Sequence, residues 1–387
     1  MKFDHKIMGK WKIATDWLAG QVPGGTKVLN AYQSMTKKWK RNGKKVPSVV
    51  CLKLEENDFI IDNNRRTYCW FKWGNIMSQD DGVIYPKDVS PQPRMLSIEE
   101  ELNAVNWSKY DVNTTVFIFD DKGEFICAKV SRRAALELGG SKGILFNEMR
   151  DLFQNVFWSK PDVSRGASRA GVGLSYKCMG WRLGYEPGAK ELKEYTFDKD
   201  IHPDVVTRMK EGMAVVTQRV EGLAKRVMNC LRDFNKFMLI KKFLDLPSVV
   251  GKDDKGNDIG ICTQIALASG AYWSNVHVDD DFFFTILSVL AGKQSRENET
   301  IYTFNFPSFS VSIPMKSGDV IIFDSKVPHC SSNAKYEDDY IYSMYVSEKS
   351  VNCNAWIKFK EDNPQEAAKV EDIMEQKKNR NKKKRKR

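Results

Sequence analysis

The residues best suited to chemistry lie in the stretch YWSNVHVDDDFFF, residues 272–284. His277 is separated by one residue from Asp279, in a chain with only four histidines. Imidazole nitrogens and carboxylate oxygens are ligands for divalent transition metals. On an extended strand alternate side chains share a face, so His277, Asp279 and Asn275 would point the same way. This spacing predicts two ligands of one metal ion, and the remaining ligands must come from elsewhere in the chain.

A third ligand is offered by His329, in the stretch SGDVIIFDSKVPHCSSN, residues 317–333. A turn glycine opens an apolar strand, and the turn DSKVP then delivers the histidine. His329 follows Asp279 by fifty positions, which suits several intervening strands of a closed β architecture. Two histidines and one carboxylate form the facial triad of non-haem Fe(II) oxygenases, whose open positions accept a co-substrate and O₂. We therefore predict a metal site at His277, Asp279 and His329.

The alternative for these two histidines is a hydrogen-bonded pair beside a solvated acidic loop. Strand alternation places Asp280 on the opposite face, whereas Asp281 shares the parity of Asp279 and lies beside the apolar run. The other histidines, His5 and His202, have no comparable context and are predicted to be surface or helix-start residues. No catalytic residue is predicted beyond the metal ligands.

The elements that must position these ligands are β segments that follow a long helix. Residues 202–244 are predicted to be helical, and an apolar stripe at helical spacing indicates a packing face: Met209, Met213, Val216, Val220, Leu223 and Val227. The short apolar runs that follow are separated by turns and are predicted as β segments: residues 260–269, 282–292, 299–306, 309–315, 318–325, 339–347 and 352–359. This pattern is typical of a sandwich or a barrel.

Upstream of the helix, residues 116–130 have the pattern of two strands joined by a DDKG turn, and residues 131–140 that of a short helix ending in glycine. The Gly-, Ser- and Arg-rich residues 161–188 are predicted to form a long surface loop. The alternative is a lid or substrate loop that offers arginines to an anion: Arg165, Arg169 and Arg182.

Charge is distributed unevenly along the chain, whose formal net charge is +11. The tail KKNRNKKKRKR, residues 377–387, contains nine of the 61 lysines and arginines and no acid, so 52 remain against 50 acids elsewhere. The eight cysteines form no C-x-x-C pair, which argues against a zinc ribbon. The N-terminus lacks the apolar core of a signal peptide, and the run FFFTILSVLAG is too short to span a bilayer. We expect an intracellular protein with reduced thiols, no membrane contact, and a nuclear location signalled by the tail.

Residues 200–350 resemble the Fe(II)/2-oxoglutarate-dependent dioxygenase superfamily, on the strength of H277-V-D279 and P328-H329. The resemblance implies an α+β fold with a double-stranded β-helix, or jelly-roll, core and supporting α-helices. It also implies that His277, Asp279 and His329 bind Fe(II), and that 2-oxoglutarate and O₂ are co-substrates. The implied reaction converts 2-oxoglutarate to succinate and CO₂ and hydroxylates an unactivated C–H bond.

One departure from the family pattern concerns the far carboxylate of 2-oxoglutarate. The family has an Arg or Lys on the strand after the distal histidine, and here that strand contains Ile341. A buried carboxylate needs a cation, because an unpaired buried charge is very costly. Lys293, favoured on the resemblance to the JmjC and asparaginyl-hydroxylase branches, and Lys335 are the candidates. Tyr342 and Ser343 could add hydroxyl donors, and Asn275 completes the co-substrate residues.

The basic tail could also contact DNA, and with the H-x-D…H core the chain resembles the TET/JBP-like group, which oxidises the methyl of thymine or 5-methylcytosine on a flipped base. A nucleobase oxygenase is thus expected, and a protein or small-molecule hydroxylase of the same superfamily is the first alternative. The second is a non-catalytic jelly roll that binds nucleic acid or another partner. The expected organisation is an N-terminal region of unknown role (1–110), a dioxygenase-like domain (111–360, core about 200–360) and a basic, disordered tail (361–387).

Overall fold

The computed structural model describes part of the 387-residue chain. The described residues are 107, 114–120, 124–132, 149–154, 175–184, 188–195, 202–228, 234, 237–238, 241, 246–252, 260–269, 274–279, 281–309, 311–331, 336, 338–352, 354–372 and 375, together with the backbone of short strands within 1–106. Within 274–277, which includes His277, only the backbone is described.

Two sheets form the body of the molecule. The ten-stranded large sheet runs in the order β1 (Lys6–Ile7), β2 (Ser48–Leu54), β7 (Thr114–Asp120), β8 (Phe125–Val130), β16 (Val320–Asp324), β13 (Phe284–Leu290), β18 (Tyr340–Tyr345), β11 (Gln264–Ser269), β9 (Ser175–Leu183) and β10 (Leu192–Glu194). The four-stranded small sheet runs in the order β12 (Ser274–His277), β17 (His329–Ser331), β14 (Thr300–Phe306) and β15 (Val311–Lys316). Neighbouring strands are antiparallel except β2 and β7, which are parallel.

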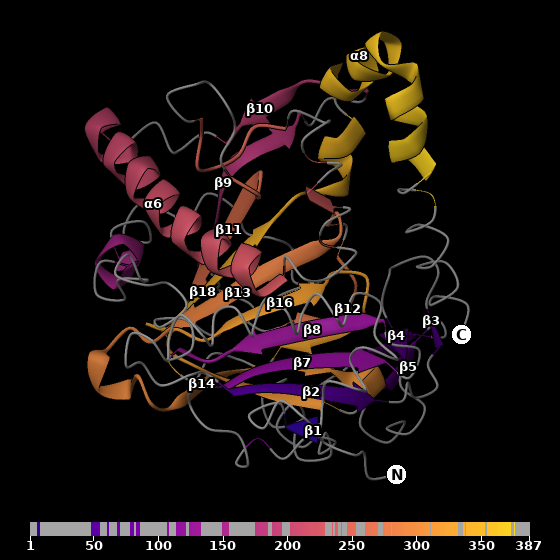
Figure 1. The fold of residues 1–387 in the computed structure, drawn as a ribbon. Helices are drawn as coiled ribbons and strands as arrows, with labels where there is room; N and C mark the ends of the chain where they lie inside the picture. The colour runs from indigo at the N-terminus through magenta and orange to yellow at the C-terminus, as the bar shows by residue number, and fades with distance from the viewer. Residues whose placement is uncertain are drawn as a thin grey trace, which may run out of the picture.

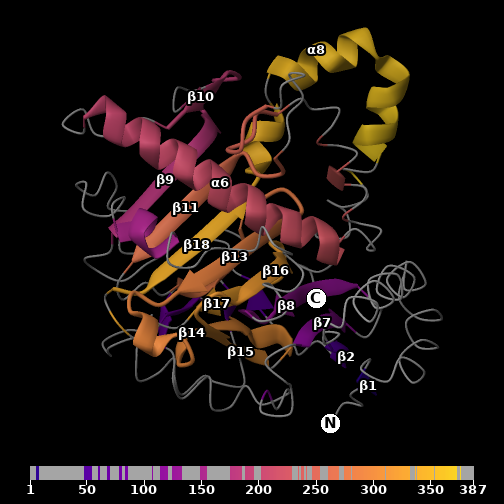
Figure 2. The same ribbon diagram turned by 60° about the vertical axis from the view of Figure 1, so that its left-hand side comes forward.

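The chain alternates between the two sheets from β11 onward. Strands β11, β13, β16 and β18 lie in the large sheet, and β12, β14, β15 and β17 lie in the small one. Apolar side chains from both sheets meet in one buried cluster, including Leu287, Ile321 and Phe323 from the large sheet and Phe304 and Ile313 from the small one. The two sheets therefore enclose a common core, with the small sheet on one side of the large sheet (Figure 2).

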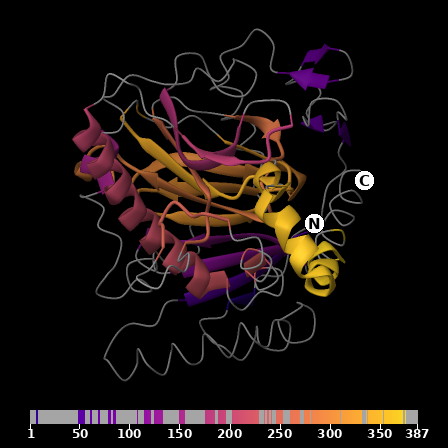
Figure 3. The ribbon, with the colours of Figure 1, turned by 90° about the horizontal axis from the view of Figure 1, so that it is seen from above.

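The other side of the large sheet is covered by α6 (Pro203–Met228), which lies across its strands (Figures 1 and 2). Proline at the first helical position and an aspartate in the first turn favour this start. The stripe predicted from helical spacing is buried against the sheet, which confirms it as a packing face: Met209, Met213, Val216, Val220, Leu223 and Val227. Seen from above, α6 and α8 (Asn354–Asp362) lie at different places along the sheet (Figure 3).

The predicted hairpin at 116–130 is confirmed as β7 and β8, which pair in antiparallel register. Six of the predicted β segments after the helix contain strands β11, β13, β14, β15, β16 and β18. The expected β segment at 352–359 is wrong: residues from 354 form α8, in which Trp356 and Phe359 stack with ring centroids 5.6 Å apart. Residues three apart lie on one face of a helix but on opposite faces of a strand, so this ring contact accords with the helix.

The expectation of a surface loop over residues 161–188 is wrong for 175–183. These residues form β9, which lies between β11 and β10 in the large sheet. Arg182 lies on that strand with its guanidinium 5.1 Å from the centroid of the Tyr195 ring. Arg165 and Arg169 lie outside the described residues, as does most of the short helix predicted at 131–140. No helix among the described residues is long and apolar enough to cross a membrane.

Candidate metal centre

Two of the predicted ligands, Asp279 and His329, meet in the structure. Nε2 of His329 lies 3.2 Å from Oδ2 of Asp279. The His329 side chain is almost completely buried, whereas 30% of the Asp279 side chain is exposed. Fifty residues and four strands separate the two positions along the chain, so the tertiary fold brings them together.

The ring of His329 is fixed in orientation by its surroundings. Nδ1 lies 2.8 Å from the carbonyl oxygen of Val327, and because a carbonyl only accepts, Nδ1 carries a proton. The ring stacks on Phe304 at a centroid distance of 5.3 Å and meets the edge of Phe323 at 4.8 Å. Nε2 therefore faces Asp279, which is the orientation of metal-binding histidines when a carbonyl holds the other nitrogen.

The backbone around Asp279 is held by the turn that precedes His329. The Asp279 N–H donates to the carbonyl oxygen of Ser325 at 3.0 Å, and the Ser325 hydroxyl donates to the carbonyl oxygen of Asp281 at 2.9 Å. The Asp281 carboxylate accepts a hydrogen bond from the Thr285 hydroxyl at 2.6 Å. Asp279 and Asp281 thus have different tasks: the first faces His329, and the second stabilises the start of β13.

His277 is placed beside these residues by its backbone. In the antiparallel pair of β12 and β17, the Cα positions of His277 and His329 are register partners, so the two residues lie directly opposite each other. The His277 side chain is not among those described, and the same holds for Asn275. No group of three potential metal ligands occurs among the side chains that are described.

The donor set of Asp279 and His329 fits a divalent transition metal. Two adjacent ligands of an octahedral ion, each about 2.1 Å from the metal, have donor atoms about 3 Å apart. The observed separation of 3.2 Å agrees with that geometry. These two residues would supply one nitrogen and one oxygen to the metal ion. Because His329 is buried and Asp279 is partly exposed, the remaining coordination positions would lie open on the side of Asp279.

A second His-x-Asp sequence in this chain shows what an ordinary pair looks like. His202 precedes α6, and Asp204 lies in its first turn. Nδ1 of His202 is 3.6 Å from Oδ2 of Asp204. Their side chains are 71% and 82% exposed, and no aromatic ring holds the histidine among the described contacts. The prediction that His202 is a helix-start residue is confirmed.

The side of β13, β16 and β18 that faces the small sheet forms the wall next to the centre. In chain order it consists of Thr285, Leu287, Val289, Ile321, Phe323, Ile341, Ser343 and Tyr345. No arginine or lysine occurs on this side of these three strands, all of whose side chains are described. Ile341 is buried in the shared core, so the position that the family pattern gives to a cation is apolar here. The far carboxylate of 2-oxoglutarate therefore does not fit this part of the wall.

The structure separates the remaining predicted co-substrate residues. Tyr342 is buried on the α6 side of the large sheet and its hydroxyl is bonded to that of Thr217, so it does not face the centre. Lys293 is exposed and lies three residues beyond the far end of β13. The length of that strand, about 20 Å, separates Lys293 from the end of β13 near Asp279. Ser343 lies on the wall that faces the small sheet. Lys335 is outside the described residues.

Lys326 is a site residue that the sequence reasoning missed. It belongs to the turn before His329, and its ammonium donates to the carbonyl oxygen of Asp279 at 3.0 Å. Its place three positions before a candidate ligand was a possible signal. Surface turns are also rich in lysine, so the sequence alone could not distinguish a lysine at the site from a solvent-exposed turn lysine.

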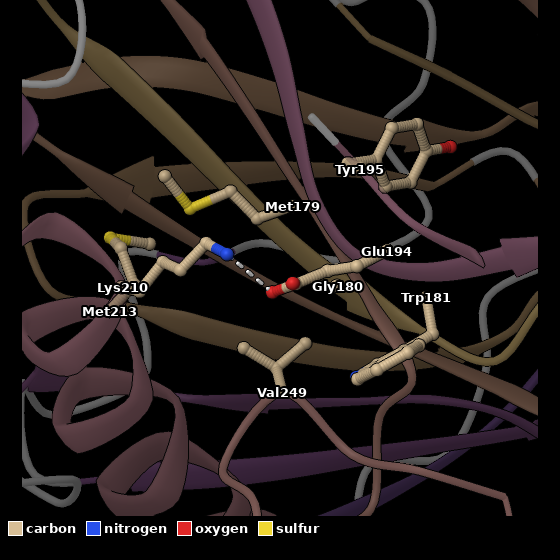
Figure 4. Close-up of a pocket in the computed structure, with 8 residues that line it drawn as sticks. All are labelled: Met179, Gly180, Trp181, Glu194, Tyr195, Lys210, Met213 and Val249. Carbon is tan, nitrogen blue, oxygen red and sulfur yellow. Dashed lines mark ion pairs between the residues drawn. The ribbon is translucent and has the colours of Figure 1, made fainter. Parts of the chain in front are cut away.

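A separate small pocket, with a cavity volume of about 40 Å³, lies between β9, β10 and α6 (Figure 4). Lys210 and Glu194 form an ion pair across it at 2.8 Å, drawn as a dashed line in Figure 4. The remaining lining residues are Met179, Gly180, Trp181, Tyr195, Met213 and Val249. Met179 and Met213 belong to the core between α6 and the sheet, whereas His329 packs against the core between the two sheets. The pocket is therefore not part of the metal centre.

No protein-family model matches the sequence, and no curated protein matches it. Several solved structures are similar at low identity. NgTET1 in complex with 5mC DNA is 13% identical over 61% of this chain and 77% of that one, with a TM-score of 0.38. A Pseudomonas putida prolyl-4-hydroxylase is 9% identical over 57% and 91% of the two chains, with a TM-score of 0.27. A prolyl hydroxylase from Trichoplax adhaerens, in complex with a hypoxia inducible factor peptide fragment, is 13% identical over 68% and 96%, with a TM-score of 0.30. Likenesses this distant do not identify the function of this chain.

Proposed function

We propose that this chain is a non-haem Fe(II) dioxygenase that uses 2-oxoglutarate and hydroxylates an unactivated C–H bond. The observation that carries the proposal is the approach of His329 Nε2 to Asp279 Oδ2 at 3.2 Å, with the histidine oriented by the Val327 carbonyl. His277, opposite His329 in the sheet, is the proposed third ligand. These residues would hold Fe(II), which supplies the oxidising chemistry with O₂ when bound.

The fold supports the same proposal. From β11 onward, the chain passes between two facing sheets and places four strands in each, which supports a double-stranded β-helix. The large sheet pairs the first, third, sixth and eighth of these strands, and the small sheet pairs the second, fourth, fifth and seventh. We propose that β11–β18 form the jelly-roll core and that α6 is its supporting helix.

The surroundings of His329 define what the protein itself contributes. Phe304 and Phe323 pack against its ring and keep water from the buried side of the centre. The partly exposed Asp279 carboxylate marks the side from which a co-substrate and a substrate would approach. For the far carboxylate of 2-oxoglutarate, we propose Lys335 as the partner, because Lys293 is remote and the described wall lacks a cation.

The proposed substrate is a base of nucleic acid, with the basic segment 377–387 as the element that supplies non-specific affinity. A basic segment could hold a duplex near the centre while the target base leaves the stack. Deleting 377–387 should weaken binding to a DNA duplex and reduce its salt dependence, without changing Fe(II) binding. Equal DNA affinity with and without the segment would contradict this assignment.

The proposed function is tested by anaerobic Fe(II) binding and by succinate formation from 2-oxoglutarate. The wild-type chain should bind one Fe(II) and form succinate, and His329→Ala and Asp279→Ala should lose both. His202→Ala is the matched control, because it removes the histidine of the other His-x-Asp pair, which is exposed. Wild-type protein that binds no Fe(II), or His329→Ala protein that binds it normally, would refute the proposal.

A further inference from the structure

We propose that Lys326 is a positioning residue for the metal centre, fixing the backbone of Asp279 so that its carboxylate faces His329. The inference rests on the proposed function and adds to it a residue that does not itself touch the metal. Lys326 is 8% exposed, which is unusual because lysine is almost never fully buried unless it is paired.

The ammonium of Lys326 makes two contacts that explain its burial. It donates to the carbonyl oxygen of Asp279 at 3.0 Å and pairs with Oε2 of Glu348 at 2.8 Å. Glu348 begins η6 (Glu348–Asn352), the short helix that follows β18. The backbone of Lys326 is itself held, since its N–H donates to the Asp324 carboxylate at 3.0 Å.

These contacts join three segments at one point. The turn between β16 and β17 contains Lys326 and delivers His329, the segment after β12 contains Asp279, and η6 contributes Glu348. The backbone contact from Asp279 N–H to the Ser325 carbonyl lies in the same turn. The N–H and the carbonyl oxygen of Asp279 are therefore both bound by consecutive residues of the turn that carries the other ligand. The position of the Asp279 backbone therefore depends directly on the turn that carries His329.

A purely structural role is the competing explanation, and the chain contains a matched lysine that separates the two. Lys129 is also largely buried, donates to a carbonyl oxygen (Pro314, 2.7 Å) and pairs with a carboxylate (Asp319, 3.2 Å). Among the described contacts, it touches neither candidate ligand nor the turn before His329. Replacing either lysine should cost stability, but only Lys326 should affect the metal.

The experiment measures Mn(II) affinity of the full chain by electron paramagnetic resonance, with Mn(II) as an oxygen-stable substitute for Fe(II), and thermal unfolding in parallel. Lys326→Met should raise the Kd for Mn(II) about tenfold or more, the size expected when an outer residue that orients a ligand is lost. Lys326→Arg, which keeps a donor and the charge, should restore part of the affinity. Lys129→Met should lower the unfolding temperature and leave the Kd unchanged.

Glu348→Gln separates the two contacts of Lys326. This variant removes the ion pair but leaves the contact with Asp279, so its Kd should stay close to that of the wild type. An unchanged Kd in Lys326→Met, or an equal rise in Lys129→Met, would overturn the positioning role while the metal site stands. Wild-type protein that binds no Mn(II) would overturn the proposed function and this inference together.

Discussion

The hydroxyl of Tyr342 on β18 and the hydroxyl of Thr217 on α6 form a hydrogen bond inside the core. The Thr217 hydroxyl also donates to the carbonyl oxygen of Met213 at 2.6 Å, so the tyrosine must be the donor to Thr217. Burial raises the pKa of Tyr342 well above its ordinary value, which keeps this donor protonated. The helix is thus fixed to the centre of the large sheet by one directional contact as well as by apolar packing.

The two partners of this bond should respond unequally to mutation. Tyr342→Phe leaves Thr217 with its donation to Met213 intact, so we expect a loss of about 1 kcal/mol in the free energy of unfolding. Thr217→Val leaves the Tyr342 donor buried without an acceptor, so we expect a larger loss, up to about 3 kcal/mol. Urea unfolding of both variants checks this order, and the reverse order would contradict the assigned donor.

Asp339 predicts a pH dependence of stability. It is almost completely buried, and burial raises its pKa from 3.8 to about 6, against the opposing effects of the Gly292 N–H and the Arg296 guanidinium. The folded state holds this proton more tightly than the unfolded chain does. The corresponding stability is therefore complete below pH 3.8 and is lost as the pH rises to about 6.

Asp339→Asn is neutral at every pH and should not show this component. The unfolding free energy of the wild type relative to Asp339→Asn should fall between about pH 4 and pH 6 and stay constant above. Asp338 raises the pKa of Asp339, so Asp338→Asn should move the window to lower pH. Urea unfolding at half-unit pH steps makes the measurement, and a difference that grows with pH would show that the direction is incorrect.

Phe283 predicts an unusual response to glycine. Its φ of 70° places a bulky residue in the left-handed region, immediately before β13, while its ring is buried among other phenylalanines. Both Phe283→Ala and Phe283→Gly lose the ring, at a cost of about 3–5 kcal/mol. Glycine should be the more stable of the two by about 1 kcal/mol, since it has no Cβ to strain.

The control for Phe283 is its neighbour. Phe284 is also buried but begins the regular strand β13, where glycine should be less stable than alanine by about 0.5–1 kcal/mol. We therefore expect the alanine and glycine variants to have opposite orders of stability at these two adjacent positions. Chemical unfolding of the four variants measures both orders. The same order at both positions would mean that the backbone at Phe283 relaxes in the variants.

The assignment of the co-substrate partner predicts different effects for two lysines. Lys335→Ala should raise the 2-oxoglutarate concentration for half-maximal succinate formation about thirtyfold or more, since an unpaired buried charge costs at least about 2 kcal/mol. Lys293→Ala should leave it unchanged, because Lys293 is exposed beyond the remote end of β13. Normal behaviour of Lys335→Ala would remove Lys335 as the partner and leave the metal ligands untouched.

Sequence periodicity predicted the parts of this fold that depend on local pattern. The helical stripe from Met209 to Val227 is buried as expected, because a 3.6-residue period leaves one face to pack. Alternation excluded Asp280 as a partner of His277, and Asp279 was preferred to Asp281, which shares its parity, because Asp281 lies farther from His277 and next to the apolar run. The turn at Phe283 and the bond to Thr285 separate them in space, and neither is a periodic feature.

The parts that sequence did not predict depend on register between distant strands. Tyr342 was expected near the co-substrate, but the pairing of β18 with β13 turns it towards α6 and leaves Ile341 and Ser343 on the other side. A shift of one residue in register would have reversed these faces. Lys326 was missed for the same reason, since its partners Asp279 and Glu348 are 47 and 22 positions away.

The adjacency of β12 and β17 in the small sheet has a consequence for how the chain matures. Their sequence separation means that the proposed metal site can form only after the chain segment that contains β13 to β16 has folded. Metal uptake would then follow folding, and an ion held only by the folded state would stabilise it by about 2.7 kcal/mol at a concentration one hundred times its Kd. Protein without bound iron should consequently be cleaved by protease faster than iron-loaded protein. The rate of cleavage would then report on the iron supply.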